Sequence, residues 1–195
     1  MGCSLHMFTE ILIDWKKPAK WVNCDNYRVH EFFEREFRRI QVYNEYDSDL
    51  FGILGKVGYE SHNKPISEPK GLPKNMSKHT KAASYSFLNV VAHSRSWFTV
   101  KELKNYLINA PPITQSGFIT LEQAKALAKG NLPNDWCQIV LGNHKQYIWK
   151  EWINNINPVT HLVNALEKHM KEVLPYGEDP KDYYDKFRIV FWFTG

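Results

Sequence analysis

Both ends of the chain carry strand patterns, and this feature most constrains the fold. Residues 5–13 alternate in hydropathy, which places His6 and Glu10 on the same face of a strand. Residues 188–194 form a second short run, rich in Phe, Trp and β-branched residues, as strands are. Because helical patterns lie between the two ends, we predict an α+β fold whose mixed or antiparallel sheet includes both terminal strands.

Three or four helices are expected to pack on this sheet. Four segments show either apolar residues at helical spacing or a capping box, in which a Thr precedes a Glu or Gln by three residues. They are residues 28–41, residues 100–108 after Thr99, residues 121–129 after Thr120, and a helix that begins at Asn157 and Pro158. Residues 50–57 fit a short helix or a buried strand equally well, and residues 84–98 are predicted to be mostly extended.

The length and composition indicate one globular domain. The chain has 195 residues, of which 43% are apolar and 24% charged, as in an average soluble protein. We therefore treat residues 1–195 as a single domain, with residues 110–157 as a candidate insertion that two prolines open. Residues 58–80 contain several Pro and Gly residues and are predicted to form a long loop of the kind that often carries function.

Charge and cysteine content exclude several classes of protein. A net charge of +4 is mild, so the concentrated basic face of a protein that binds duplex nucleic acid is not expected. No apolar run approaches the roughly 18–20 residues that cross a bilayer, and no secretory signal is evident, so no membrane partner is expected. Cys3, Cys24 and Cys137 form no CxxC pair, which favours a reducing cytoplasm and argues against a metal site. No P-loop or GxGxxG motif is present, so no cofactor is predicted.

The segment His93-Ser94-Arg95-Ser96-Trp97 is the strongest local signal of a binding site. It lies directly before the Thr99 capping box, where the unpaired N–H groups and the dipole of a helix favour an anion. The Arg95 guanidinium, the hydroxyls of Ser94 and Ser96 and the flat indole of Trp97 would suit a nucleotide phosphate and base. The structural alternative is a short strand that enters a helix, with Trp97 in the core and Arg95 paired with a surface carboxylate.

His6 is the second candidate, with Glu10 beside it on the same strand face. Such a pair can orient a general acid or base, although a histidine at a sheet edge can also be purely structural. If His6 and His93 met in one pocket, they could cleave a phosphodiester without a metal, one accepting a proton and the other donating one. Lys70, in the proline-rich loop, could reach a phosphate, or it could simply be solvated.

Five segments together resemble a family of small phage and prophage proteins. That family has a Gly-Cys-Asp-Ile-His strand, an Asn-Tyr-x-Leu-Phe-x-Ile-Leu stretch, a Pro-Ile-Ser-x-Pro-Lys-Gly-Leu-Pro loop, a His-Ser-His-Ser-Trp-x-Thr segment and an Arg-Ile-Val-Phe-Trp-Phe strand. This chain has similar segments, in the same order, at residues 2–6, 49–54, 65–73, 93–99 and 188–193. It departs from the pattern at Ser4, where the family has Asp, and at Arg95, where the family has a second His.

The resemblance implies a phage accessory protein of the host bacterial cytoplasm, of a kind that counters host defence. We therefore expect a protein that binds and sequesters a small nucleotide-derived immune signal, such as a cyclic nucleotide. Two alternatives stay open. One is a metal-independent phosphodiesterase that uses His6 and His93, and the other is a protein that binds and inhibits a host defence enzyme. A homo-oligomer is compatible with each of them.

Overall fold

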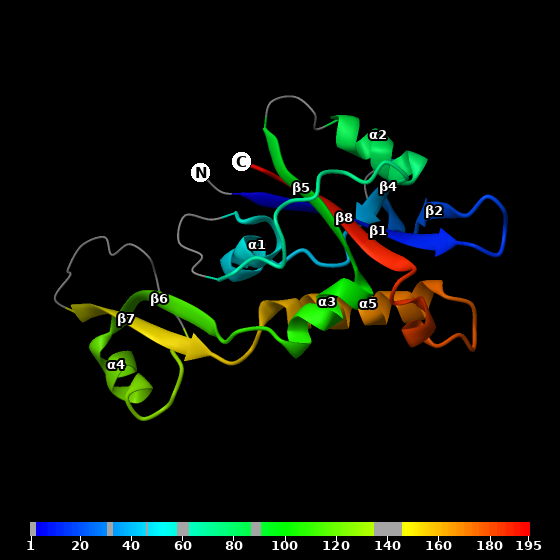
Figure 1. Ribbon diagram of the computed structural model, residues 1–195. Helices are drawn as coiled ribbons and strands as arrows, with labels where there is room; N and C mark the ends of the chain where they lie inside the picture. The colour runs from blue at the N-terminus through cyan, green and yellow to red at the C-terminus, as the bar shows by residue number, and fades with distance from the viewer. Residues whose placement is uncertain (1–2, 31–32, 46, 58–62, 87–90, 135–145) are drawn as a thin grey trace. The chain divides into compact units, whose positions relative to one another are not determined.

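A computed structural model describes residues 3–30, 33–45, 47–57, 63–86, 91–134 and 146–195 (Figure 1). The chain forms two compact units. The first consists of Met1–Asn109 with Pro158–Gly195, and the second of Ala110–Asn157. Each unit is described by itself below.

The first unit is built on a four-stranded sheet that contains both ends of the chain. In spatial order its strands are β2 (Lys20–Asn23), β1 (Ser4–Ile13), β8 (Phe187–Thr194) and β5 (Ala92–Thr99). All three pairings are antiparallel. The N-terminal and C-terminal strands are direct neighbours, with His6 opposite Trp192 and Glu10 opposite Arg188. The predicted α+β fold, with both terminal strands in its sheet, is confirmed.

The two faces of this sheet differ in chemistry, because successive residues of β8 point to opposite sides. One face is apolar and packs on α1 (Ser48–Gly55), α3 (Val100–Ile108) and α5 (Pro158–Val173). Phe193 meets Phe51 of α1 edge to face, and Phe187 meets His169 of α5 in the same way. The other face contains Arg188 and Trp192 and lies toward α2 (Lys78–Ser86), whose His79 contacts Phe8 of β1.

Capping residues explain where the helices begin. At α3, the Thr99 side chain accepts from the Glu102 amide and the Glu102 carboxylate accepts from the Thr99 amide, so the predicted capping box is formed. Asp47 caps α1 by accepting from the Leu50 amide, which favours the helix over the strand that residues 50–57 also fit. α5 begins at Pro158, as predicted.

The prediction of a helix over residues 28–41 is wrong. That region contains an antiparallel strand pair, β3 (Asn26–His30) and β4 (Phe33–Ile40), in which Tyr27 lies opposite Arg39 and Arg28 opposite Arg38. Tyr, Val, Phe and Ile favour strands, and pairing two strands satisfies the same backbone groups as a helix would. The apolar spacing therefore fitted a helix without specifying one.

The other differences concern α2 and the number of helices. α2 includes the last residues of the predicted loop 58–80 and the first residues of the predicted extended segment 84–98. Residues 58–62 and 87–90 of those two segments lie outside the described residues. The described residues hold five α-helices, one or two more than expected. A short 3₁₀ helix, η2 (Pro180–Tyr183), precedes β8.

The second unit consists of a β-hairpin and one short helix. β6 (Ile113–Thr120) pairs antiparallel with β7 (Tyr147–Asn154), and α4 (Leu121–Leu127) begins at the predicted Thr120 capping box. Ile113, Ile119 and Trp152 are buried. Across the described parts of both units, no helix has the length and apolar character needed to span a membrane.

Candidate functional site

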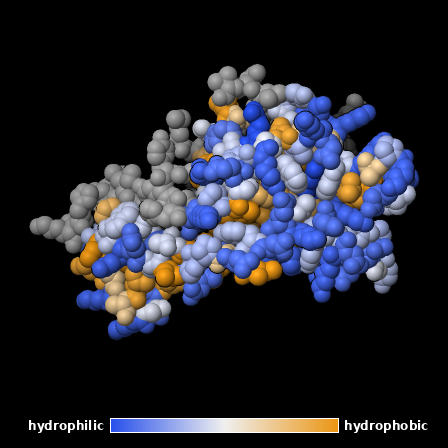
Figure 2. Space-filling view, viewed as in Figure 1, coloured by the Kyte–Doolittle hydropathy of each residue, from blue (hydrophilic) through white to orange (hydrophobic). Residues whose placement is uncertain are grey.

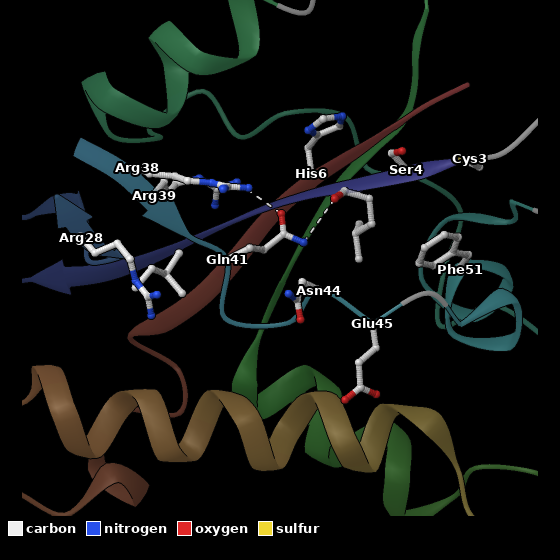
Figure 3. A pocket seen from close by; sticks show the side chains of 12 residues that line it. Cys3, Ser4, His6, Arg28, Arg38, Arg39, Gln41, Asn44, Glu45 and Phe51 are labelled. Atoms are coloured by element: carbon white, nitrogen blue, oxygen red, sulfur yellow. Dashed lines mark hydrogen bonds between the residues drawn. The ribbon is translucent and has the colours of Figure 1, made fainter. Parts of the chain in front are cut away.

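A cavity of about 630 Å³ lies along the edge of β1, near the start of the strand. His6, Arg28, Arg38, Arg39, Gln41 and Asn44 are among the residues that line it (Figure 3). Its volume falls within the range of roughly 300–1,000 Å³ that is usual for small-molecule pockets. The arginines come from β3 and β4, so the strand pair that replaces the predicted helix supplies the positive charge.

Side chains, rather than a neighbouring strand, satisfy this edge of β1. β2 pairs with β1 only from Glu10 onward, which leaves the backbone groups of residues 5–9 to find other partners. The Gln41 side chain accepts from the Met7 amide (3.2 Å) and donates to the Leu5 carbonyl (3.2 Å), and the Asp25 carboxylate accepts from the Thr9 amide (2.8 Å). The cavity wall is therefore tied directly to the edge of the sheet.

Arg39 is held in one orientation by several partners. Its guanidinium donates to the Met7 carbonyl, lies 3.3 Å from Asp25 and 3.3 Å from Gln41, and stacks 3.8 Å from the centre of the Phe8 ring. An arginine fixed in this way loses little further conformational entropy when it binds a ligand.

His6 stands on the same strand with its ring stacked on Trp192, the two ring centres being 6.0 Å apart. Its Nε2 lies 2.9 Å from the Thr194 hydroxyl. Burial first, and the positive charge of Arg39 second, lower the pKa of His6 below its ordinary value. A bound anion would oppose the second effect and favour the charged imidazolium.

Arg28 and Arg38 face each other directly across the strand pair. Both are exposed, and neither makes an ion pair with any of the described residues. Like charges directly opposite each other destabilise a sheet. Of the described residues that line the cavity, one is acidic, Glu45, and it extends away from the arginines (Figure 3). A pair of unneutralised arginines in a cavity is the arrangement that a bound phosphate would stabilise.

The structure does not bring His6 and His93 together. His6 stacks on Trp192, whereas His93 stacks on Phe193, with ring centres 6.1 Å apart. Trp192 and Phe193 are consecutive residues of β8 and point to opposite faces of the sheet. The two imidazoles therefore lie on opposite faces of the sheet, with β8 between their strands.

The predicted binding segment on β5 contains a β-bulge. The register with β8 shifts between His93 and Ser96, and Ser94 has a positive φ of 49°. The Ser94 hydroxyl lies 3.3 Å from Nδ1 of His93, and the buried Ser96 hydroxyl accepts from the Lys70 amide (3.2 Å). Arg95, which is partly exposed, accepts from the Gly71 amide through its backbone carbonyl. The bulge thus attaches the proline-rich loop to the sheet edge.

The N-terminus of α3 is occupied by the chain itself. The Glu102 carboxylate accepts from the Thr99 amide (2.7 Å) and pairs with Lys70 (2.8 Å), whose ammonium lies 4.0 Å from the centre of the Trp97 ring. Burial disfavours the charged carboxylate, but the hydrogen bonds from Lys70 and Thr99 outweigh it and lower the pKa of Glu102. Lys70 and Trp97 lie together, but a carboxylate of the protein stands at the helix start where the sequence favoured an anion.

Glu10 is part of a buried ion pair and does not orient His6. Its carboxylate accepts from Arg188 Nη2 (2.7 Å) and Nε (2.9 Å), and its other oxygen accepts from the Ser77 amide (2.7 Å). Glu10 is fully buried and Arg188 is 2% exposed. A second cavity, of about 550 Å³, lies over this pair between Trp21 and Trp97. Glu10 and Arg188 neutralise each other there, and the other charged lining residues, Lys74 and Asp185, are of opposite sign, so this second cavity offers less net charge than the first.

Metal ligands do not gather anywhere in the described parts of the chain. Among those residues no group of three or more His, Cys, Asp or Glu side chains is placed to hold a metal ion. Most of the polar side chains that line the first cavity are cationic or amide groups, which suit an anion.

Sequence reasoning found His6 but missed the three arginines and Gln41. The helix predicted over residues 28–41 assigned no role in a site to Arg28, Arg38 or Arg39. The available signal was the length of the segment, which also accommodates two short strands rich in aromatic residues. Compared with known protein families, with curated proteins and with solved structures, the chain matches none of them.

Proposed function

We propose that this protein binds and sequesters a small nucleotide-derived signal by its phosphate groups, in the cavity at the edge of β1. The observation that carries the proposal is the pair Arg28 and Arg38, which face each other in a cavity without an acidic partner among the described residues. Arg39 and His6 add two further groups that can contact an anion. Planar guanidinium groups bind phosphate oxygens in a bidentate manner, which gives both affinity and orientation.

The size and lining of the cavity support a small ligand with an uncharged part. A cavity of about 630 Å³ holds more than an inorganic phosphate. Gln41 and Asn44 offer amide groups that can bind the edges of a base or sugar, although Gln41 is partly engaged by β1. The phage setting and the role against bacterial defence rest on the five motifs described above.

Sequestration is supported over cleavage by the positions of the two histidines. Phosphodiester cleavage with one imidazole as base and another as acid needs both beside the same phosphate. His6 borders the cavity, whereas His93 stacks on the opposite face of the sheet. A binding protein needs no such pair.

The experiment that tests this proposal is a ligand-release assay. The protein is incubated with a panel of cyclic mononucleotides and dinucleotides, freed of unbound ligand, heat-denatured, and the released material is identified by mass spectrometry. We expect an intact nucleotide from the wild type and none from Arg28→Gln/Arg38→Gln. Altered nucleotide would show an enzyme, and no uptake of any nucleotide would refute the proposal in favour of a protein partner.

Arg95→Gln serves as the matched control, because it removes the same charge from β5. Retained ligand in Arg95→Gln, together with its loss in Arg28→Gln/Arg38→Gln, places the site at the edge of β1. The opposite result would move the site to the β5 segment that the sequence favoured.

A further inference from the structure

α2 presents a basic and aromatic stripe to solvent. Lys78 and Lys81 are exposed one helical turn apart, and Tyr85, one turn further on, is 58% exposed. The Lys81 ammonium lies 6.0 Å from the centre of the Tyr85 ring. Figure 2 shows that the surface over α2 is mainly hydrophilic.

The opposite side of α2 fixes the direction of this stripe. Ser77, Thr80 and Ser84 are buried, and the Ser77 hydroxyl lies 2.9 Å from that of Thr80. The Ser77 amide also donates to the buried Glu10 carboxylate. Because these contacts anchor the inner side of the helix to the sheet, Lys78, Lys81 and Tyr85 must face outward.

No acidic residue of this part of the sequence neutralises the stripe. Between Glu68 and Glu102 the chain has six Lys or Arg residues and no Asp or Glu. Among the described residues, neither Lys78 nor Lys81 makes an ion pair. The mild net charge of the whole chain therefore conceals a local concentration of positive charge.

The stripe is continuous with the cavity through Tyr27 and His79. His79, next to Lys78 on α2, lies with its Nε2 2.6 Å from the Tyr27 hydroxyl. Tyr27 is 40% exposed and stands directly opposite Arg39, which lines the cavity. Positive and aromatic groups thus extend from the cavity across Tyr27 to α2.

We infer that the ligand of the cavity can be the phosphorylated end of a short single-stranded oligonucleotide, whose chain continues over α2. Lysines at helical spacing contact successive phosphates, and exposed tyrosines stack on unpaired bases, which a duplex does not offer. This inference rests on the proposed function, because the cavity arginines hold the terminal phosphate. It goes beyond that function by naming a longer ligand and a second set of contacts.

The test compares 5′-phosphorylated dT8, labelled at its 3′ end, with dTMP as a competitor, by fluorescence anisotropy at several salt concentrations. We expect dT8 to bind at least about tenfold more tightly than dTMP, because stacking and additional phosphate contacts add to the affinity. Lys78→Gln/Lys81→Gln should weaken dT8 binding and leave dTMP binding unchanged. Losing two phosphate contacts should reduce the slope of log affinity against log salt by about 1.4.

Lys168→Gln/Lys171→Gln is the matched control, since these lysines are exposed at the same spacing on α5. It should bind dT8 as the wild type does. If dTMP binds but dT8 binds no more tightly, or if both lysine pairs have equal effects, the inference is overturned and the proposed function stands. If Arg28→Gln/Arg38→Gln leaves dTMP binding intact, the proposed function fails instead.

Discussion

Two regions of the first unit hold arginines, the buried middle of the sheet and the cavity at the edge of β1, and they differ in how those arginines are neutralised. Arg188, near the middle of the sheet, is buried, bonded to Glu10 and Asn75, and stacked 3.8 Å from the centre of the Trp21 ring. At the strand edge, Arg28 and Arg38 are exposed opposite each other without an ion-pair partner among the described residues. The first arrangement is neutralised within the protein, whereas in our proposal a bound anion neutralises the second. Whether an arginine already has a carboxylate partner is therefore a better guide to its availability for a ligand than the presence of the arginine alone.

The largest expected effect on stability comes from breaking the buried ion pair of Glu10 and Arg188. Arg188→Met leaves the Glu10 carboxylate buried without its partner, so we expect the free energy of unfolding to fall by about 3–5 kcal/mol. Urea denaturation measures this change. The double variant Glu10→Leu/Arg188→Met removes both charges and should regain much of the loss. A loss below about 1 kcal/mol in Arg188→Met would contradict the structural role of the pair.

Removing Arg28 from the cavity at the edge of β1 should lower the affinity for anions and leave the free energy of unfolding nearly unchanged. Arg28→Gln loses charge-assisted hydrogen bonds, and we expect the affinity for pyrophosphate to fall by about 1.5–3 kcal/mol. That corresponds to about a 10- to 150-fold rise in Kd, measured by isothermal titration calorimetry. Equal losses of affinity and of unfolding free energy would show that Arg28 supports the fold instead.

A change of charge at Arg38 sharpens the contrast further. Arg38→Glu replaces a like-charge cross-strand pair by an opposite-charge pair with Arg28, so the free energy of unfolding should rise by about 0.2–1 kcal/mol. Binding of anions should be lost in the same variant. Arg38→Gln is the control, because it removes the repulsion without adding an attraction. Its free energy of unfolding should lie between those of the wild type and Arg38→Glu. A less stable Arg38→Glu would contradict the predicted repulsion.

The smallest expected effect concerns pH. Burial and Arg39 lower the pKa of His6 in the folded state, whereas the unfolded chain keeps the ordinary value of 6.5. Below pH 6.5 the unfolded chain therefore binds more protons, and the free energy of unfolding falls until the pH passes below the folded pKa. His6→Gln keeps a polar group near Thr194 and should reduce this fall. Urea denaturation of the wild type and of His6→Gln at pH 8, 6.5 and 5.5 measures this fall. If the free energies of unfolding of the two proteins depend on pH in the same way, the lowered pKa of His6 is contradicted.

The fold could be predicted where the pattern and local chemistry agree. The alternation around His6 and Glu10 specifies a strand, and Thr99 and Thr120 specify helix starts, because each signal depends on near neighbours in the sequence. Residues 28–41 carry a pattern that fits two structures. The choice between them depends on long-range contacts, such as those of Gln41 and Asp25 with the edge of β1, which a single sequence does not display.

The candidate site could be predicted only in part, for the same reason. His6 was identified from its strand, but the arginines and amide side chains of its cavity come from residues 22 to 38 positions further along the sequence. Glu10 was correctly placed on the face of His6, yet its partner Arg188 comes from the other end of the chain. Pairing of charges, which decides what each residue does, depends on tertiary structure and not on spacing.

The most direct test of the unpaired arginines is ligand-induced stabilisation. The denaturation midpoint is measured against pyrophosphate concentration for the wild type and for Arg28→Gln/Arg38→Gln, with ionic strength held constant by chloride. The wild type should gain about 2.7 kcal/mol of stability when pyrophosphate reaches a hundred times its Kd, while the variant stays nearly unchanged. An equal gain in both proteins would contradict the assignment of the anion site to Arg28 and Arg38.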